Sequence, residues 1–146
     1  NLLRSAAPGF ISFTGDVTLA RSSGMHREWR QLSVRRRAVM TASTIAHNTR
    51  WAAIQASGPE TWRAVAEQIS HYLSESQAAG LLAGDAPRRA FYVKCDQDTN
   101  GRGNGLSFLV GLALARPDEF VAFRFEHDVA DCRVTEISDW RVPGLA

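Results

Sequence analysis

Residues 106–125 read LSFLVGLALARPDEFVAFRF, two apolar runs separated by the polar break Arg116-Pro117-Asp118. The first run, Leu106–Leu114, is almost continuously apolar, as in a strand that is covered on both faces. The second run, Phe120–Phe125, has the composition of a further strand, and a proline inside the break is unfavourable for continuing a ladder. We therefore expect two strands of one sheet here.

The strand pattern extends to both sides of this stretch. Ala90–Cys95 alternates between apolar and polar residues after a turn, and Arg133–Ile137 reads as a fourth strand. Near the start, Phe10–Thr14 lies between Pro-Gly and Gly-Asp turn signals and predicts one more short strand.

Two other segments have helical spacing. The first begins near Ser33, a plausible N-cap, and the second has a capping-box spacing at Ser57–Glu60 and a glycine stop at Gly80. We expect Trp62 and Tyr72 of the second helix in the core. The apolar faces comprise Val34, Ala38, Thr41, Ala42 and Ile45 in the first helix, and Trp62, Val65, Ala66, Ile69, Tyr72 and Leu73 in the second. Together the elements predict an α+β fold, with two helices packed on one face of a mostly antiparallel sheet.

Composition limits the possible classes of protein. The 146 residues are 45% hydrophobic and 22% charged, which suits one sizeable core. No apolar run reaches the roughly 18 residues of a membrane-spanning helix. The chain begins with Asn1 rather than Met, so we expect it to be part of a longer protein.

Charge is distributed unevenly along the chain. Residues 1–50 hold eight arginines and two acidic residues, a balance of +6, whereas residues 117–146 have a balance of −4. A basic head and an acidic tail suit contact between proteins, including copies of one chain, although both can equally be solvated surface.

Asp96-Gln-Asp98-Thr-Asn100-Gly101 matches the opening of a calcium-binding loop, with oxygen ligands at alternate positions. Asp96, Asp98 and Asn100 would be the candidate ligands. The twelfth position, which needs a bidentate Glu, is Ser107. Asp, Asn and Gly are also ordinary turn residues, so we expect a plain turn, with a calcium-dependent binding module as an alternative.

Arg35-Arg36-Arg37 lies at a helix start and could bind phosphates, which makes a small nucleic-acid-binding domain a further alternative. The net charge of only +2 and the lack of interleaved exposed aromatics argue against it. Three consecutive arginines project in three directions around a helix, an arrangement that suits bridging several neighbours.

No catalytic constellation appears in the sequence. His26, His47, His71 and His127 form no pair at metal-ligand spacing. Cys95 and Cys132 fit no metal or redox motif, and we expect reduced thiols rather than a disulfide. The sequence therefore predicts neither an enzyme nor a cofactor-binding protein.

Several blocks in order resemble the C-terminal domain of contractile phage tail sheath proteins, the family shared with R-type pyocins and contractile injection systems. The resemblance covers roughly residues 25–126. Its strongest block runs from Gly80 through the Ala90-Phe-Tyr-Val-Lys-Cys-Asp96 strand to Asn100. The other matching blocks are Trp29–Arg37, Asn48–Trp51, the Trp62, Val65 and Ile69 face, and Val110–Arg124.

The resemblance implies a structural subunit of a contractile sheath, which polymerises around an inner tube protein and drives contraction by rearrangement of subunits. Residues 1–128 would form the sheath-like domain, and residues 129–146 a C-terminal extension that adds a strand to a neighbouring copy. Arg35, Arg36, Arg37, Val134 and Ile137 are the expected subunit contacts. The implied location is a virion tail or a cytoplasmic contractile particle in a bacterial host, with no membrane partner.

Overall fold

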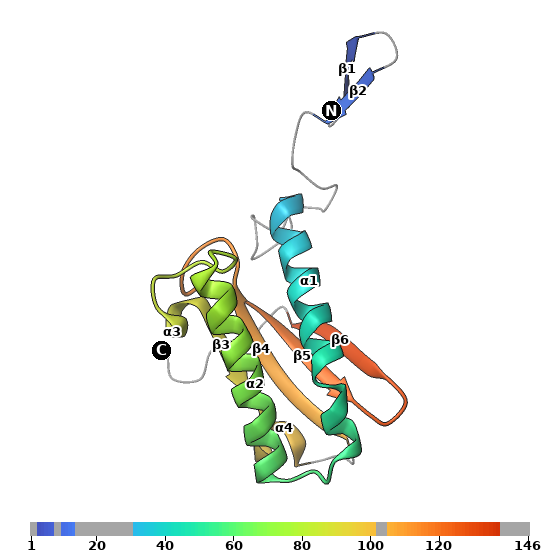
Figure 1. The fold of residues 1–146 in the computed structure, drawn as a ribbon, viewed down its shortest axis with the longest axis vertical. Coiled ribbons are helices and arrows are strands. Elements are labelled where there is room, and N and C mark those ends of the chain that lie inside the picture. Colours follow the sequence, from blue (N-terminus) through green and yellow to red (C-terminus); the bar gives the residue numbers. More distant parts are fainter. Residues whose placement is uncertain (1–2, 8–9, 14–30, 102–104, 138–146) are drawn as a thin grey trace.

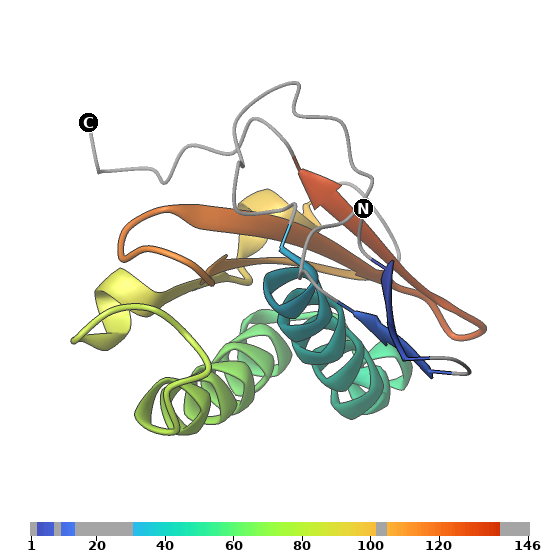
Figure 2. The same cartoon turned by 90° about the horizontal axis from the view of Figure 1, so that it is seen from above.

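The computed structural model describes residues 3–7, 10–13, 31–101 and 105–137, and it confirms the α+β architecture. Two long helices cover one face of a four-stranded antiparallel sheet (Figures 1 and 2). The predicted strand near the start corresponds to β2 (Phe10–Phe13), which pairs with an unpredicted strand, β1 (Leu3–Ala7), in a separate hairpin.

The main sheet has the order β3-β4-β5-β6, so neighbours in sequence are neighbours in space. Its strands are β3 (Phe91–Lys94), β4 (Leu106–Ala113), β5 (Phe120–His127) and β6 (Cys132–Ile137). The two runs of the 106–125 stretch are paired directly, with Phe108 opposite Phe125 and their rings stacked at a centroid distance of 4.8 Å.

The central strand β4 is buried on both faces, as its almost continuously apolar pattern predicts. Phe108, Val110 and Leu112 point into the main core, while Leu109 and Ala113 on the other face are also buried. Gly111 lies under Phe120, whose Cβ would be 3.3 Å from any Cβ added at this glycine. Close packing of the two strands therefore favours a residue without a side chain there.

The first long helix, α1 (Leu32–Asn48), buries the predicted face from Val34 to Ile45 without exception. The expected N-cap at Ser33 is wrong. The N-cap is Gln31, because its carbonyl accepts the first helical hydrogen bond, from the Arg35 amide at 3.1 Å. A short 3-10 helix, η2 (Arg50–Ile54), follows α1.

The second long helix, α2 (Pro59–Ala78), has Pro59 at its start, and Gly80 stops it just beyond its C-cap, as expected. Gly80 has φ +76°. Its amide donates to the Gln77 carbonyl and the Leu81 amide donates to the Ser76 carbonyl, which forms a Schellman motif. The predicted capping box is wrong: the N-cap is Gly58, and the Ser57 hydroxyl instead accepts a hydrogen bond from the Trp62 indole at 3.1 Å.

Trp62 and Tyr72 lie at the margin of the core rather than inside it. Both are half-buried and pack against the central cluster, while Val65, Ile69 and Leu73 of the same helix are buried. Two single-turn helices, α3 (Pro87–Ala90) and α4 (Gln97–Asn100), flank β3. The expected plain turn at 96–101 is therefore helical.

The predicted fourth strand exists, but its pairing differs from the expected arm. Residues 132–137 form β6 and pair with β5 of the same chain, from Ala122–Ile137 to His127–Cys132. The turn Asp128–Asp131 folds the chain back onto the open edge of β5, so intrachain pairing replaces the expected pairing in trans for this segment. The expected boundary between residues 128 and 129 falls inside this hairpin, and residues 138–146 lie outside the described residues.

Candidate functional site

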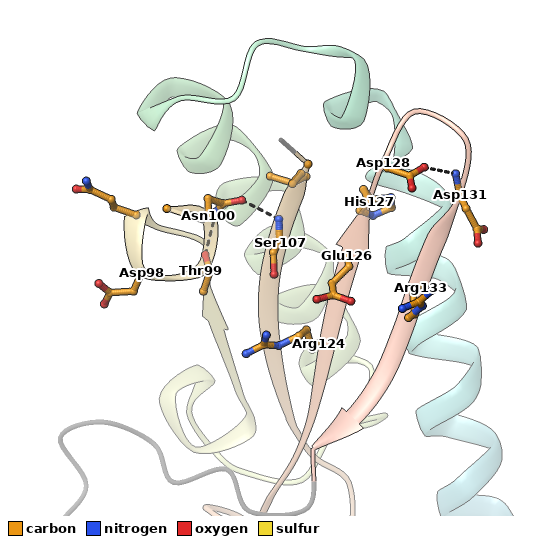
Figure 3. Close-up of a pocket in the computed structure, with 14 residues that line it drawn as sticks. Asp98, Thr99, Asn100, Ser107, Arg124, Glu126, His127, Asp128, Asp131 and Arg133 are labelled. Atoms are coloured by element: carbon orange, nitrogen blue, oxygen red, sulfur yellow. Dashed lines mark hydrogen bonds between the residues drawn. The ribbon is translucent and has the colours of Figure 1, made fainter. Parts of the chain in front are cut away.

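A groove of about 950 Å³ crosses the end of the sheet where β4 begins and β5 ends (Figure 3). It lies between α4 on one side and the β5–β6 hairpin on the other. Opposite charges line it: Arg124 and Glu126 project from β5, and Arg133 of β6 is directly opposite Glu126 in the strand register. Such a surface suits polar contact with another macromolecule more than capture of an apolar small molecule.

The α4 wall of the groove is built by a closed set of hydrogen bonds. The Asp96 carboxylate accepts the Thr99 amide, and the Thr99 hydroxyl accepts the Asp96 amide, which completes a capping box. Buried Asn100 then joins this turn to the sheet: its Oδ1 accepts the Ser107 amide at 2.7 Å and its Nδ2 donates to the Asp96 carbonyl at 2.9 Å.

These bonds bear directly on the calcium hypothesis. Lys94 Nζ donates to Asp98 Oδ2 at 2.9 Å and lies 3.6 Å from Asp96 Oδ2, and its pairing with Asp98 raises the pKa of Lys94. Asp98 and Asn100 point in opposite directions from α4 (Figure 3). The three candidate oxygen donors thus have protein partners and are not gathered around one point.

On the opposite face of the same sheet end, His127 is buried, with 2% of its surface exposed. Its Nε2 lies 2.9 Å from the Thr49 hydroxyl and 3.5 Å from Cys132 Sγ, and its ring stacks on Phe108. The Thr49 hydroxyl donates its one hydrogen to the Ile45 carbonyl, so His127 Nε2 must be the donor to Thr49. Burial, with a contribution from nearby Arg50, lowers the pKa of His127.

By sequence, His127 is only one of four scattered histidines. The signal that could have found it is the alternation of β5, because Phe123, Phe125 and His127 occupy the same face of a strand. A histidine that ends such an apolar face is expected to be buried, and a buried imidazole needs a partner.

The two cysteines are free thiols. Burial raises the pKa of Cys95 to about 11, and burial also raises the pKa of Cys132. Both thiols are therefore protonated near neutral pH, and neither has the lowered pKa of a nucleophilic cysteine.

The arginine cluster does not act as one surface. Arg35 and Arg36 are exposed on α1, whereas Arg37 is half-buried and donates to the Leu81 carbonyl at 3.2 Å, beyond the end of α2. One of the three expected subunit contacts thus bridges two parts of its own chain.

The other two expected contacts occupy opposite faces of the edge strand. Val134 is opposite Phe125 and so lies on the helix side, with 38% of its surface exposed. Ile137 is opposite Ala122 on the other side and is half-buried. Among the described strands, β6 pairs only with β5, which leaves its second edge open.

Within residues 31–101 and 105–137, no three His, Cys, Asp or Glu side chains come together in a group that could hold a metal ion. None of the helices in the described ranges is long and apolar enough to span a membrane.

Comparison with protein-family models gives no match, and comparison with curated proteins gives none either. Among solved structures, the chain is similar to a chain in the cryo-EM structure of the anti-feeding prophage baseplate, 6-fold symmetrised, with 25% identity and a TM-score of 0.63. The likeness covers 82% of this chain and 34% of that one. It supports the coarser part of the expectation, a relation to contractile particles, but it does not single out the sheath.

Proposed function

We propose that this chain is a structural domain of a contractile particle of the tail-sheath type, which assembles with copies of itself around an inner tube protein. The observation that carries the proposal is the match in fold to a chain of the anti-feeding prophage baseplate over 82% of the present chain. The sequence blocks that resemble sheath proteins, such as Ala90–Asp96 and Val110–Arg124, form β3, β4, β5 and their connections, so they are the framework of that fold.

The open edge of β6 supports assembly by strand addition. An unpaired edge offers backbone donors and acceptors to an extended segment of a neighbour. Val134 on β6 is 38% exposed, so apolar surface accompanies the open backbone groups. We propose that a neighbouring copy supplies a strand here, and that rings of six copies form, in keeping with the symmetry of the baseplate structure.

The proposed role requires no catalysis. The charged side chains of the groove in Figure 3 serve as contacts between subunits, and contraction follows from rearrangement of those contacts. We propose that the chain has no enzymatic activity and binds no cofactor, and that it resides in a phage tail or a contractile particle of the bacterial cytoplasm.

Electron microscopy of the chain mixed with the tube protein of the same particle tests this function. Rings or tubes are expected, and Val134→Lys should abolish them because a charge on the edge blocks strand addition. Ile54→Lys is the matched control, since Ile54 is 71% exposed and belongs to η2 rather than to a strand. Normal assembly of the Val134→Lys protein would exclude β6 as the joining edge, and absence of any ordered assembly would contradict the sheath-type role.

A further inference from the structure

A second groove lies at the opposite end of the domain from the β5–β6 turn. Its floor is apolar and comes from Val34 of α1, Leu82 and Leu114, which are between 2% and 5% exposed. Arg37 and Arg116 stand at its rim, and its volume is about 480 Å³. We call this the basic groove.

The groove has a positive environment. The first turn of α1 contains no acidic residue, and Arg35 and Arg36 follow directly after it. The start of a helix itself carries a partial positive charge, so these arginines add to the positive potential there. Glu119, whose Oε1 lies 3.5 Å from Arg116, offsets part of this charge. An anionic partner would therefore be favoured at this end.

The β5–β6 turn, Asp128–Asp131, has the complementary properties, and we call it the acidic turn. Figure 1 shows it projecting from the end of the sheet remote from the start of α1. Val129 is 81% exposed, the largest exposure among the exposed large apolar side chains of the described residues. Asp128 and Asp131 flank it, so an apolar tip is bordered by two carboxylates.

Hydrogen bonds from backbone amides to the two aspartate side chains hold the acidic turn in one conformation. Asp128 Oδ1 accepts the amides of Ala130 and Asp131, both at 2.7 Å, and Asp131 Oδ1 accepts the Cys132 amide at 2.8 Å. The backbone hydrogen bonds lower the pKa of Asp128, so its carboxylate stays charged well below neutral pH. A turn that is already ordered loses little conformational entropy on binding.

We propose that the acidic turn of one copy docks in the basic groove of the next copy. Val129 would contact the apolar floor, and the two aspartates would face Arg37 and Arg116. The proposal rests on the self-assembly of the proposed function and names one contact surface of it.

The geometry gives this contact a definite consequence. Because the groove and the turn lie on different parts of the surface, the contact is heterologous, and repeating it links copies head to tail into an open array or a ring. A single turn in a small groove buries little area, so each contact is weak by itself and becomes effective through repetition.

Site-specific photo-crosslinking tests the contact without requiring a finished particle. The full chain carries p-benzoylphenylalanine in place of Val129, and crosslinked peptides are identified by mass spectrometry. Crosslinks to Gly80–Ala83 or Leu114–Arg116 of another copy are expected. The control places the same residue at Ile54, which is similarly exposed and should not label those peptides. Crosslinks only to other regions, or none between copies, would overturn the proposal.

A charge exchange provides the second test. Asp131→Arg and Arg116→Glu should each weaken association by about tenfold in sedimentation experiments, and the double variant should restore it, because the introduced arginine of one copy then faces the introduced glutamate of the next. Arg88→Glu, at an exposed arginine of α3, is the matched control for charge, and circular dichroism checks folding. Single variants that associate like the unmodified chain, or a double variant without recovery, would refute the contact. If rings or tubes form although the turn does not dock in the groove, the proposed function stands and this contact is refuted. If the crosslinks reach the groove but no rings or tubes form, the contact stands and the proposed function is contradicted.

Discussion

The imidazole of His127 and the hydroxyl of Thr49 lie 2.9 Å apart, and this bond joins the end of β5 to the end of α1 across 78 residues of sequence. Both side chains are buried, so neither can replace its partner with bulk water. The contact holds the helix layer against the sheet next to the β5–β6 hairpin. The same hairpin carries the acidic turn and the open edge, so its position is important for both proposed contacts.

Thr49→Val should destabilise the fold by about 1–3 kcal/mol, because it leaves the buried Nε2–H of His127 without its partner. Thr44→Val is the matched control: Thr44 makes the same type of bond to a carbonyl four residues earlier, but it is only half-buried and that bond stays within α1. Urea unfolding measures both. Equal losses in the two variants would mean that the His127 contact contributes nothing specific.

Stability should decrease as pH falls below the ordinary histidine pKa of about 6.5. Burial lowers the pKa of His127 in the folded chain, so the unfolded chain binds a proton at a higher pH than the folded chain does. Acidification therefore stabilises the unfolded chain relative to the folded one. The loss of stability should increase until the pH reaches the pKa of His127 in the folded chain, and it should then level off. Arg50 opposes protonation, and Cys132, a neutral thiol near neutral pH, does not favour it.

The measurement is the free energy of unfolding between about pH 5 and pH 7.5, where histidine is the main titrating group. His127→Gln should flatten this dependence, whereas His71→Gln should keep it, since His71 is exposed on α2. A pH dependence unchanged in the His127→Gln protein would assign it to other groups.

Asn100→Ala should cost about 1–3 kcal/mol, because the Ser107 amide and the Asp96 carbonyl would both lose a buried partner. The expected local effect is loss of order in α4 and at the start of β4, visible as faster hydrogen exchange of the Ser107 amide. Asn48→Ala is a suitable control, since the Asn48 side-chain amide donates to the Thr44 carbonyl in an exposed bond within α1. Unchanged exchange at Ser107 would show that the bond is dispensable.

Calcium at millimolar concentration should leave the melting temperature unchanged. Lys94 already pairs with Asp98, and Asp96 is engaged in capping α4, so an ion would have to displace both interactions. Differential scanning fluorimetry with and without the ion provides the measurement. A calcium-dependent rise in melting temperature that disappears in Asp98→Asn would restore the calcium-binding hypothesis.

Periodicity predicted the layers well. The burial of Val34 through Ile45 on α1, and of nearly all of β4, was readable from spacing, because helices and strands repeat with fixed local periods. Cap positions were less predictable: Ser33 and Ser57 carry suitable side chains, but the helices begin where the backbone can close its first hydrogen bond, at Gln31 and Gly58.

The sequence by itself determined which residues form strands and helices and which side of each is apolar, since these depend on neighbours along the chain. Only the tertiary structure decided that His127 bonds Thr49, that Asn100 bonds the start of β4, and that residues 132–137 pair with their own β5. The physical reason is that each of these contacts depends on where the packing of the core places groups that are distant in sequence or free to choose another partner. The basic groove and the acidic turn belong to the same class, because the charge imbalance was visible in the sequence but its placement at two remote surfaces was not.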